Sequence, residues 1–331
     1  MPVKHWSFAG LMLTDWCNAR CASCYLCCGP DRTGRMGLTE ALRYWRGLIE
    51  ACPHGCRIHL SGGEPFGDWE FLIELCRRAA AEGLGPLEKI ETNAFWAGDV
   101  RTIADRLHQL DAAGMGKLVI SADPYHQQFV PIGNCRLLAA TAEEVLGAGR
   151  VQVRWRQWLK DGFDTDGLGQ AHRRQLFAAY AAGGADRPTG RAAEALAGEL
   201  PCRPASEFAD KPCKEALLRS RHVHVDPGGR LVPGVCAGIV LGDASRESIG
   251  EIWRRLSRDH ASRPIVAALS AGGPAGLLPL AEAAGLTPRQ GYAGKCHLCW
   301  DVRRHLAGRG LFADELAPGW LYGAESVGRP G

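Results

Sequence analysis

The sequence has no block of lysine or arginine residues that would mark a nucleic-acid or membrane surface. Its 331 residues carry a formal net charge of +3, with both signs interspersed along the chain. Such a balance provides no broad electrostatic attraction to a polyanion. We therefore expect neither nucleic acid nor a membrane as a partner.

Long unbroken hydrophobic runs are also missing. The apolar stretch near the N-terminus is short and meets a charged residue at Asp15, which argues against a secretory segment. The most apolar later stretch, residues 264–280, is interrupted by glycines and prolines at Gly272, Gly273, Pro274 and Pro279. We therefore expect a cytoplasmic chain. Its 46% hydrophobic and 23% charged residues suffice for a sizeable core.

Cysteine, by contrast, is plentiful, with fourteen residues. A disulfide scaffold is typical of small exported chains, whereas this chain is large and groups its cysteines in C-x2-C patterns. Metal-bound thiolates in a reducing compartment are the better interpretation. Four isolated cysteines are expected to be small buried hydrophobic residues, namely Cys52, Cys56, Cys76 and Cys135.

Three cysteines near the N-terminus have the spacing C-x3-C-x2-C, at Cys17, Cys21 and Cys24. A closed zinc site takes four ligands, and iron–sulfur clusters are usually held by four cysteines. Three thiolates on a four-iron cluster leave one iron open to a small molecule. A ferredoxin-type run starting at Cys21 fits worse, because its fourth cysteine would fall at Asp31.

The first half of the sequence alternates strand-like and helical segments, which predicts parallel βαβ units. Strands are expected at residues 8–14, 57–60, 87–91, 117–120 and 151–158. Helices are expected at residues 38–51, 69–82, 99–112 and 136–146, with Thr39 capping the first. The first four strands each end in a polar, glycine-rich or cysteine-rich motif, at the edge where parallel α/β folds bind ligands.

The cysteine triad followed by Ser61-Gly62-Gly63-Glu64-Pro65 resembles the radical S-adenosylmethionine (SAM) superfamily over about residues 8–160. The resemblance implies a partial (β/α)6, TIM-like barrel and a 4Fe-4S cluster on the three cysteines. SAM would then chelate the open iron. Gly62 and Gly63 would offer main-chain groups to the SAM amino group, with the Glu64 carboxylate nearby and Pro65 ending the motif. A plain strand-ending turn is the alternative for these residues.

Further SAM contacts are expected at the ends of the next two strands. Thr92-Asn93 and Ser121-Ala-Asp123 would contact the methionine part and the ribose, unless they serve only local turns. His126 is a candidate for the same cavity. Arg154 and Arg156 are expected on one face of the fifth strand, either holding a carboxylate or solvated. The family often has an aromatic residue before its third cysteine, where this sequence has Ser23, with Tyr25 just after.

The C-terminal part holds a second cysteine set around a predicted hairpin, HVHVD-PGG-RLVPGV. It resembles the SPASM or twitch extensions of peptide-modifying radical SAM enzymes. Cys213, Cys236, Cys296 and Cys299 would hold one auxiliary 4Fe-4S cluster, or else a structural zinc ion. In a third hypothesis, Cys202 replaces Cys236 as a ligand, and the free Cys236 donates a hydrogen atom to a substrate radical.

The fold class is therefore expected to be α/β, with a small C-terminal twitch-like α+β module. The expected divisions are a radical SAM core at 8–160, a helical connection completing the barrel at 161–212, the module at 213–317 and a loosely held tail at 318–331. Two helical stretches are expected within the module, near 248–261 and 276–285.

The resemblance implies an enzyme that cleaves SAM reductively, with an external electron donor such as flavodoxin or ferredoxin. The resulting 5′-deoxyadenosyl radical would take a hydrogen atom from a substrate. A ribosomally made peptide undergoing epimerisation or cross-linking is the expected substrate. A small molecule is the alternative. A non-catalytic iron–sulfur carrier or zinc-stabilised binding protein is the alternative from another class.

Overall fold

One eight-stranded sheet runs through the computed structural model, which describes residues 3–183 and 187–323. The strand order is β5-β4-β3-β2-β1-β6-β7-β8. Six of these strands, from β5 to β6, are parallel, and β7 and β8 continue the sheet antiparallel. The sheet does not close on itself, so the architecture is a partial barrel, as the sequence predicted.

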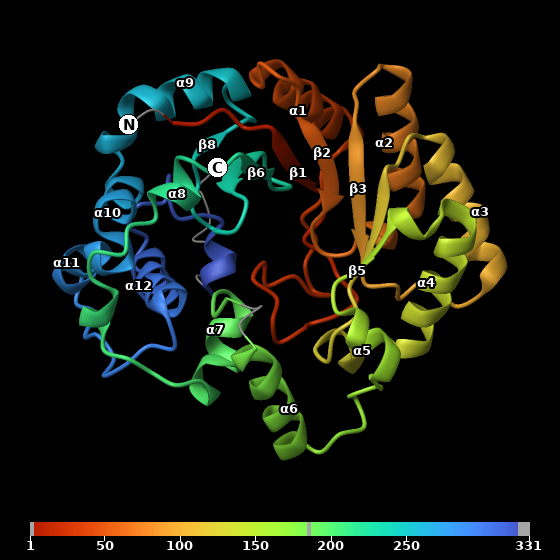
Figure 1. The fold of residues 1–331 in the computed structure, drawn as a ribbon. Coiled ribbons are helices and arrows are strands. Elements are labelled where there is room, and N and C mark those ends of the chain that lie inside the picture. Colours follow the sequence, from red (N-terminus) through yellow and green to blue (C-terminus); the bar gives the residue numbers. More distant parts are fainter. Residues whose placement is uncertain (1–2, 184–186, 324–331) are drawn as a thin grey trace.

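The first five strands alternate with helices, as the sequence pattern indicated. The strands are β1 (Phe8–Met12), β2 (Arg57–Ser61), β3 (Leu87–Thr92), β4 (Lys117–Ile120) and β5 (Val151–Val153). The helices between them are α1 (Leu38–Ala51), α2 (Trp69–Ala81), α3 (Val100–Ala112) and α4 (Ile132–Leu146). These helices lie along the outer side of the strands (Figure 1). Their apolar faces pack on the sheet, as shown by the full burial of Trp45, Leu72 and Leu107.

The sixth parallel strand, β6 (His222–Val225), pairs with β1 and not with β5. β6 and β7 (Arg230–Pro233) form the predicted hairpin, and β8 (Gly242–Asp243) follows. Strand β1 therefore lies between β2 and β6 in the middle of the sheet. The C-terminal half of the chain thus shares one sheet with the N-terminal half.

Two local predictions were wrong. Helix α1 begins after Gly37, with no side-chain cap, so Thr39 does not cap it. The fifth strand ends at Val153, and the chain turns into the short helix α5 (Arg156–Asp161). Arg156 therefore leaves the strand face and bonds to Glu143 of α4 at 3.0 Å, because a helical turn replaces the expected alternation.

The remaining helical segments surround the open side of the barrel. They are α6 (Gln170–Ala182), α7 (Arg191–Ala195), α8 (Lys214–Leu217), α9 (Ile249–Asp259), α10 (Pro264–Gly272), α11 (Leu278–Ala283) and α12 (Lys295–Gly308). Short 3-10 turns are η1 (Pro65–Gly67), η2 (His126–Gln128), η3 (Ala148–Arg150), η4 (Ala197–Glu199), η5 (Ala205–Phe208), η6 (His260–Ser262), η7 (Gly273–Leu277) and η8 (Gly319–Tyr322). Blue and green segments thus face the orange and yellow half (Figure 1).

Among the described residues, one helical stretch, Pro264–Ala283, has the length and composition to cross a membrane. It is divided into α10, η7 and α11, and Ile265, Val266 and Leu269 are fully buried. A core helix passes the same test, so this stretch is weak evidence for a membrane span.

Two further expectations concern burial. The four isolated cysteines are buried as expected: Cys52, Cys56, Cys76 and Cys135. The start of the expected loose tail is instead packed, since Leu321 and Tyr322 are buried and the Tyr322 hydroxyl donates to the Gly238 carbonyl at 2.7 Å. Residues 324–331 of that expected tail lie outside the described residues.

Candidate active site

The three N-terminal cysteines line one cavity at the C-terminal edge of the parallel strands. The segment after β1, residues 17–28, is here called the cysteine loop. The cavity also takes in Ser61, Gly62, Gly63 and Glu64 after β2, Glu91, Thr92 and Asn93 at the end of β3, and Ser121, His126 and Arg154. Most residues proposed to contact SAM are therefore brought together. Ser23 and Tyr25 line the cavity too.

A fourth thiol, Cys28, also lines this cavity, which the sequence reasoning missed. Cys28 hydrogen-bonds to Cys24, and this bond, helped by Arg191 and opposed by burial, lowers the pKa of Cys24 to about 6. Cys27, the third member of the ferredoxin-type alternative, adopts a positive φ of 54° and is absent from the cavity lining. The adjacent C-C pair in the sequence was the signal that one of the two points inward.

The two glycines after β2 bring that segment against residues 14–16, which lead into the cysteine loop. A Cβ on Gly63 would lie 1.9 Å from the Trp16 carbonyl oxygen, and one on Gly62 would lie 2.6 Å from that of Thr14. The Gly63 N–H donates to the Thr14 carbonyl at 2.6 Å, and the Glu64 N–H donates to that of Trp16 at 2.9 Å. The segments that follow β1 and β2 can approach this closely because neither glycine has a side chain to separate them.

Glu64 is a buried carboxylate that ties β2 to β3. It accepts hydrogen bonds from the Phe66 N–H at 3.1 Å, the Thr92 hydroxyl at 2.9 Å and the Asn93 N–H at 2.6 Å. Burial raises its pKa to about 7, against the opposing effect of these donors. Pro65 begins the turn η1 and does not line the cavity.

Asn93 links the end of β3 to the cysteine loop. Its amide nitrogen lies 3.6 Å from the Cys17 sulfur and donates to the Asn18 side-chain oxygen at 2.8 Å. The Ala19 N–H also approaches the Cys17 sulfur, at 3.4 Å. These donors suit a thiolate, because hydrogen bonds to sulfur stabilise its charged form.

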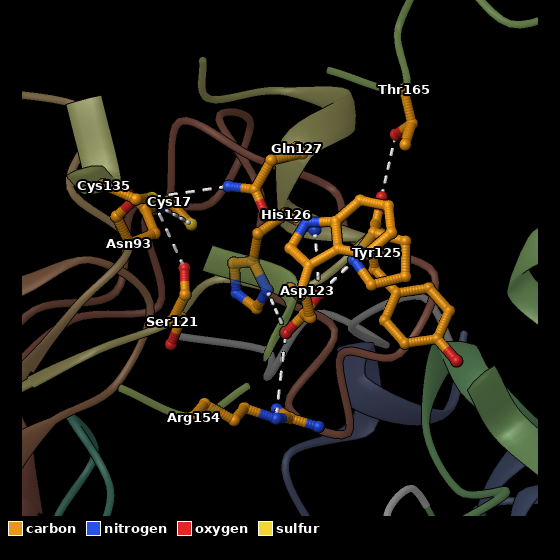
Figure 2. A network of polar contacts seen from close by, with 12 residues as sticks. Cys17, Asn93, Ser121, Asp123, Tyr125, His126, Gln127, Cys135, Arg154 and Thr165 are labelled. Carbon is orange, nitrogen blue, oxygen red and sulfur yellow. Dashed lines mark hydrogen bonds and ion pairs between the residues drawn. The ribbon is translucent and has the colours of Figure 1, made fainter. Parts of the chain in front are cut away.

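Asp123 lies behind the cavity wall and positions two cationic side chains that do line it. Its carboxylate lies 2.8 Å from His126 Nδ1 and 3.7 Å from Arg154 Nε (Figure 2). The His126 placement agrees with the expectation for that residue. Although burial alone favours the neutral ring, Asp123 and Cys21 raise the pKa of His126 well above its usual value. The Asp123 carboxylate is thus engaged by protein groups.

Arg191, which the sequence reasoning missed, holds the cysteine loop from the opposite side. Its guanidinium donates to the Cys21 carbonyl at 2.9 Å and the Cys28 carbonyl at 2.7 Å. The main-chain N–H of Arg191 donates to the Cys24 carbonyl at 3.0 Å. The preceding Gly190 has a φ of +61°, and a Cβ there would lie 2.6 Å from the Tyr25 carbonyl oxygen. Helix α7 therefore begins in contact with the loop.

The second cysteine set also assembles in space. The pKa of the Cys236 thiol is raised to about 12, mainly by burial and also by the neighbouring thiols of Cys299, Cys296 and Cys213. The buried Arg303 stands beside Cys236 and Cys299 and donates to the Ala237 carbonyl at 2.8 Å. A buried guanidinium suits a site that gathers thiolate charge.

Cys202 is placed apart from this set. It is exposed, and its thiol donates to the Leu200 carbonyl at 3.5 Å. It lines a different pocket, with Arg289 and His297. The arrangement therefore groups Cys236 with the other three cysteines.

The described residues thus form an open parallel α/β barrel with a cysteine-lined cavity at its C-terminal edge. In motif and architecture the chain resembles radical SAM enzymes. No protein-family model matches the chain. YydG of Bacillus subtilis (strain 168), named for a role in peptide biosynthesis, is 32% identical over 124 residues, which is 36% of each chain. The match thus spans about a third of that relative's length.

Several solved structures are similar at low identity. BtrN in complex with AdoMet and 2-DOIA is 15% identical with a TM-score of 0.46, over 78% of this chain and 90% of that chain. A structure of anSMEcpe with bound AdoMet and Cp18Cys peptide is 13% identical with a TM-score of 0.43, over 92% and 98%. Streptococcus suis SuiB bound to S-adenosylmethionine is 13% identical with a TM-score of 0.36, over 77% and 66%. These values are too low to assign a role to any residue.

Proposed function

We propose that the protein is a radical SAM enzyme. The observation that carries this proposal is the convergence of the cysteine triad, the Gly-Gly-Glu segment and the ends of β3 and β4 on one cavity. Cys17, Cys21 and Cys24 would hold a 4Fe-4S cluster, and SAM would occupy the space between the cluster and the strand ends. The cluster and SAM, when bound, supply reductive cleavage of SAM to methionine and a 5′-deoxyadenosyl radical.

The chain's own residues would bind and orient these groups. Asn93 and the Ala19 N–H would stabilise the Cys17 thiolate, and Arg191 would fix the loop that carries the other two ligands. His126 and Arg154 would present positive charge to the carboxylate or ribose of SAM. Asp123 would hold both in place, which revises its expected direct ribose contact. Glu64 would fix the glycine segment.

Cys28 would stand close to the cluster as a non-ligand thiol. Because its thiol interacts with that of Cys24, it would be a donor to one ligand sulfur. Such outer contacts tune the potential of a cluster.

The proposed substrate is a ribosomally made peptide, altered by epimerisation or cross-linking. Support comes from the similarity to YydG, named for peptide biosynthesis, over 124 residues.

The second cysteine set would hold one auxiliary 4Fe-4S cluster. Zinc at about 2.3 Å from each thiolate would place sulfurs about 4 Å apart. Among the described residues, no three cysteine sulfurs lie within 4.8 Å of one another; the group that meets this limit is His59, His222 and His224. The wider spacing of the cysteine sulfurs favours a cluster over a single zinc ion.

The decisive experiment is anaerobic reductive incubation of the reconstituted protein with SAM. We expect 5′-deoxyadenosine and methionine from the wild type and from Cys76→Ala, a buried cysteine outside both sets. The triple variant Cys17→Ala, Cys21→Ala, Cys24→Ala should produce neither. Absence of 5′-deoxyadenosine from the wild type would refute the proposal.

Iron analysis of that triple variant tests the second set. It should retain about half the wild-type iron, because one cluster remains. Retention of zinc bound by sulfur, without iron, would instead support the zinc site at these cysteines. A variant holding no metal would disprove both.

Reaction with a candidate precursor peptide in D2O separates the two peptide chemistries. Epimerisation places one deuterium on the altered residue, whereas cross-linking removes two hydrogen atoms. If Cys236 donates the hydrogen atom, Cys236→Ala should still form 5′-deoxyadenosine but incorporate no deuterium. If Cys236 is only a ligand, the variant should lose auxiliary iron.

A further inference from the structure

Three histidines occupy the interior of the barrel, one layer below the cavity. Parallel barrels usually fill such layers with branched apolar side chains. Here His59 of β2 and His224 of β6 are both paired in register with Gly10 of β1, on either side of it. His222 lies two residues before His224 and therefore points to the same face. Side chains from β2 and β6, the strands on either side of β1, therefore come together over Gly10.

Gly10 is the residue that makes room for this arrangement. A Cβ there would lie 2.5 Å from His59 Nε2 and 2.7 Å from His224 Nε2. Both ring nitrogens therefore face the space left open by the missing side chain. The ring of Phe8, in the layer below, stacks on His59 at 4.8 Å between centroids.

The ring nitrogens are close together and incompletely partnered. His59 Nε2 and His222 Nε2 are 3.0 Å apart, and one nitrogen from each of the three rings lies within 4.8 Å of the other two. His59 and His224 are 2% and 3% exposed, and the Nδ1 atoms of both lack a hydrogen-bond partner. Neither tautomer of His59 satisfies both of its ring nitrogens, because a neutral imidazole always has one donor and one acceptor.

We propose that His59, His222 and His224 bind a single divalent transition metal ion of the zinc class. Two imidazole nitrogens bound to tetrahedral zinc at 2.0–2.1 Å lie about 3.4 Å apart, close to the separation of His59 and His222. Three histidines leave the fourth position to water. Thiolate ligands are not involved, so this site is chemically distinct from both cysteine sets.

The surroundings suit a cation held by neutral imidazoles. The Glu91 carboxylate lies 3.6 Å from His59 Nδ1, which is the position of an outer acceptor that orients a metal-bound histidine. Lys89 opposes a cation here, but its ammonium is paired with Glu91 at 2.7 Å. His222 is half-buried, which gives an ion access from outside.

The metal would join the two halves of the chain. His59 belongs to the N-terminal βα units, whereas His222 and His224 begin the C-terminal hairpin. The ion would clamp β2 to β6 across β1. Glu91 also accepts a hydrogen bond from Ser61 in the cavity lining at 3.0 Å, so the clamp would support the cavity floor.

Zinc K-edge X-ray absorption on the iron-loaded, full-length protein tests the proposal. Wild type given one equivalent of Zn2+ should show imidazole nitrogen neighbours at about 2.0–2.1 Å and no sulfur neighbours at about 2.3 Å. The double variant His59→Gln, His222→Gln should lose this zinc while keeping its iron. The matched control His172→Gln, at an exposed position on α6, should retain it.

The wild-type spectrum decides even if the double variant does not fold. Zinc surrounded only by sulfur, or no bound zinc at one equivalent, would overturn the proposal. Equal nitrogen-bound zinc in the wild type and a folded double variant would overturn it too. None of these readouts uses SAM, so they are independent of the proposed enzyme activity.

Discussion

Gly63→Ala should separate the glycine segment from residues 14–16, which lead into the cysteine loop. A Cβ at this position would lie 1.9 Å from the Trp16 carbonyl oxygen, whereas real Cβ contacts stay above 3.0 Å, so the backbone must move by about 1.1 Å. Both atoms belong to the main chain, so a change of side-chain rotamer cannot relieve the clash. The movement acts directly on the residue that precedes Cys17.

The expected cost follows from the contacts that such a shift breaks. Two main-chain hydrogen bonds join the segments, at 2.6 Å and 2.9 Å, and each contributes about 1 kcal/mol. Overpacking adds about 1–3 kcal/mol. A total of ~3–5 kcal/mol corresponds to a Tm lower by ~6–10 °C at about 2 °C per kcal/mol for a chain of this size. Iron bound at the triad should fall as well.

Thermal unfolding followed by far-ultraviolet circular dichroism, with iron analysis of the same samples, provides the assay. Gly98→Ala is the matched control, because a Cβ at Gly98 has no neighbour within 4 Å and its φ is not positive. The control should keep the wild-type Tm and iron content. If Gly63→Ala also stayed within about 1 °C of wild type with full iron, the close-approach argument would be refuted.

Three other substitutions test separate features. Arg191→Met should lower the iron content of the triad, because two guanidinium bonds to loop carbonyls are lost, and unchanged iron would contradict this role. Arg303→Met should lower auxiliary iron and destabilise the fold by about 2–4 kcal/mol, since the buried Tyr322 hydroxyl loses a charged partner; an unchanged Tm would count against it. Burial, and then Asp226, raise the pKa of Asp15 to about 7 from a usual 3.8. Ionisation of Asp15 therefore destabilises the folded state. This destabilisation is absent below pH ~4 and complete above pH ~7. Asp15→Asn should therefore gain stability relative to wild type as pH rises from 5 to 8, on the order of 3 kcal/mol, and parallel Tm profiles would exclude the effect.

Much of the fold could be predicted because its signals are local. Helix α1 was expected at the bounds observed, since its apolar spacing and flanking loops lie in one window of sequence. The cavity could be predicted because each strand and its terminal motif are recognised locally. Parallel strands then place their C-terminal ends at one edge of the sheet. The fifth strand was overextended, because residues 154–158 continue an alternating pattern that a turn into α5 overrides.

The parts that were missed depend on contacts distant in sequence. Arg191 contacts a loop about 170 residues earlier, and the position of the α7 segment decides that contact. The three histidines gave no spacing signal, because His59 and His222 are 163 residues apart. Only the pairing of β6 with β1 brings them together.

That same pairing has a consequence for how the chain is assembled. Strand β1 has one neighbour from residues 57–61, but its second edge stays unpaired until residues 222–225 have been made. Contacts of such high sequence separation form slowly and leave an adhesive strand edge exposed meanwhile. The cysteine loop follows β1 after a short connection, so the strand that carries it lacks its second neighbour until about two thirds of the chain has left the ribosome. On the proposed function, metal loading of the cysteine loop would then come late in synthesis, after residues 222–225 have completed the sheet.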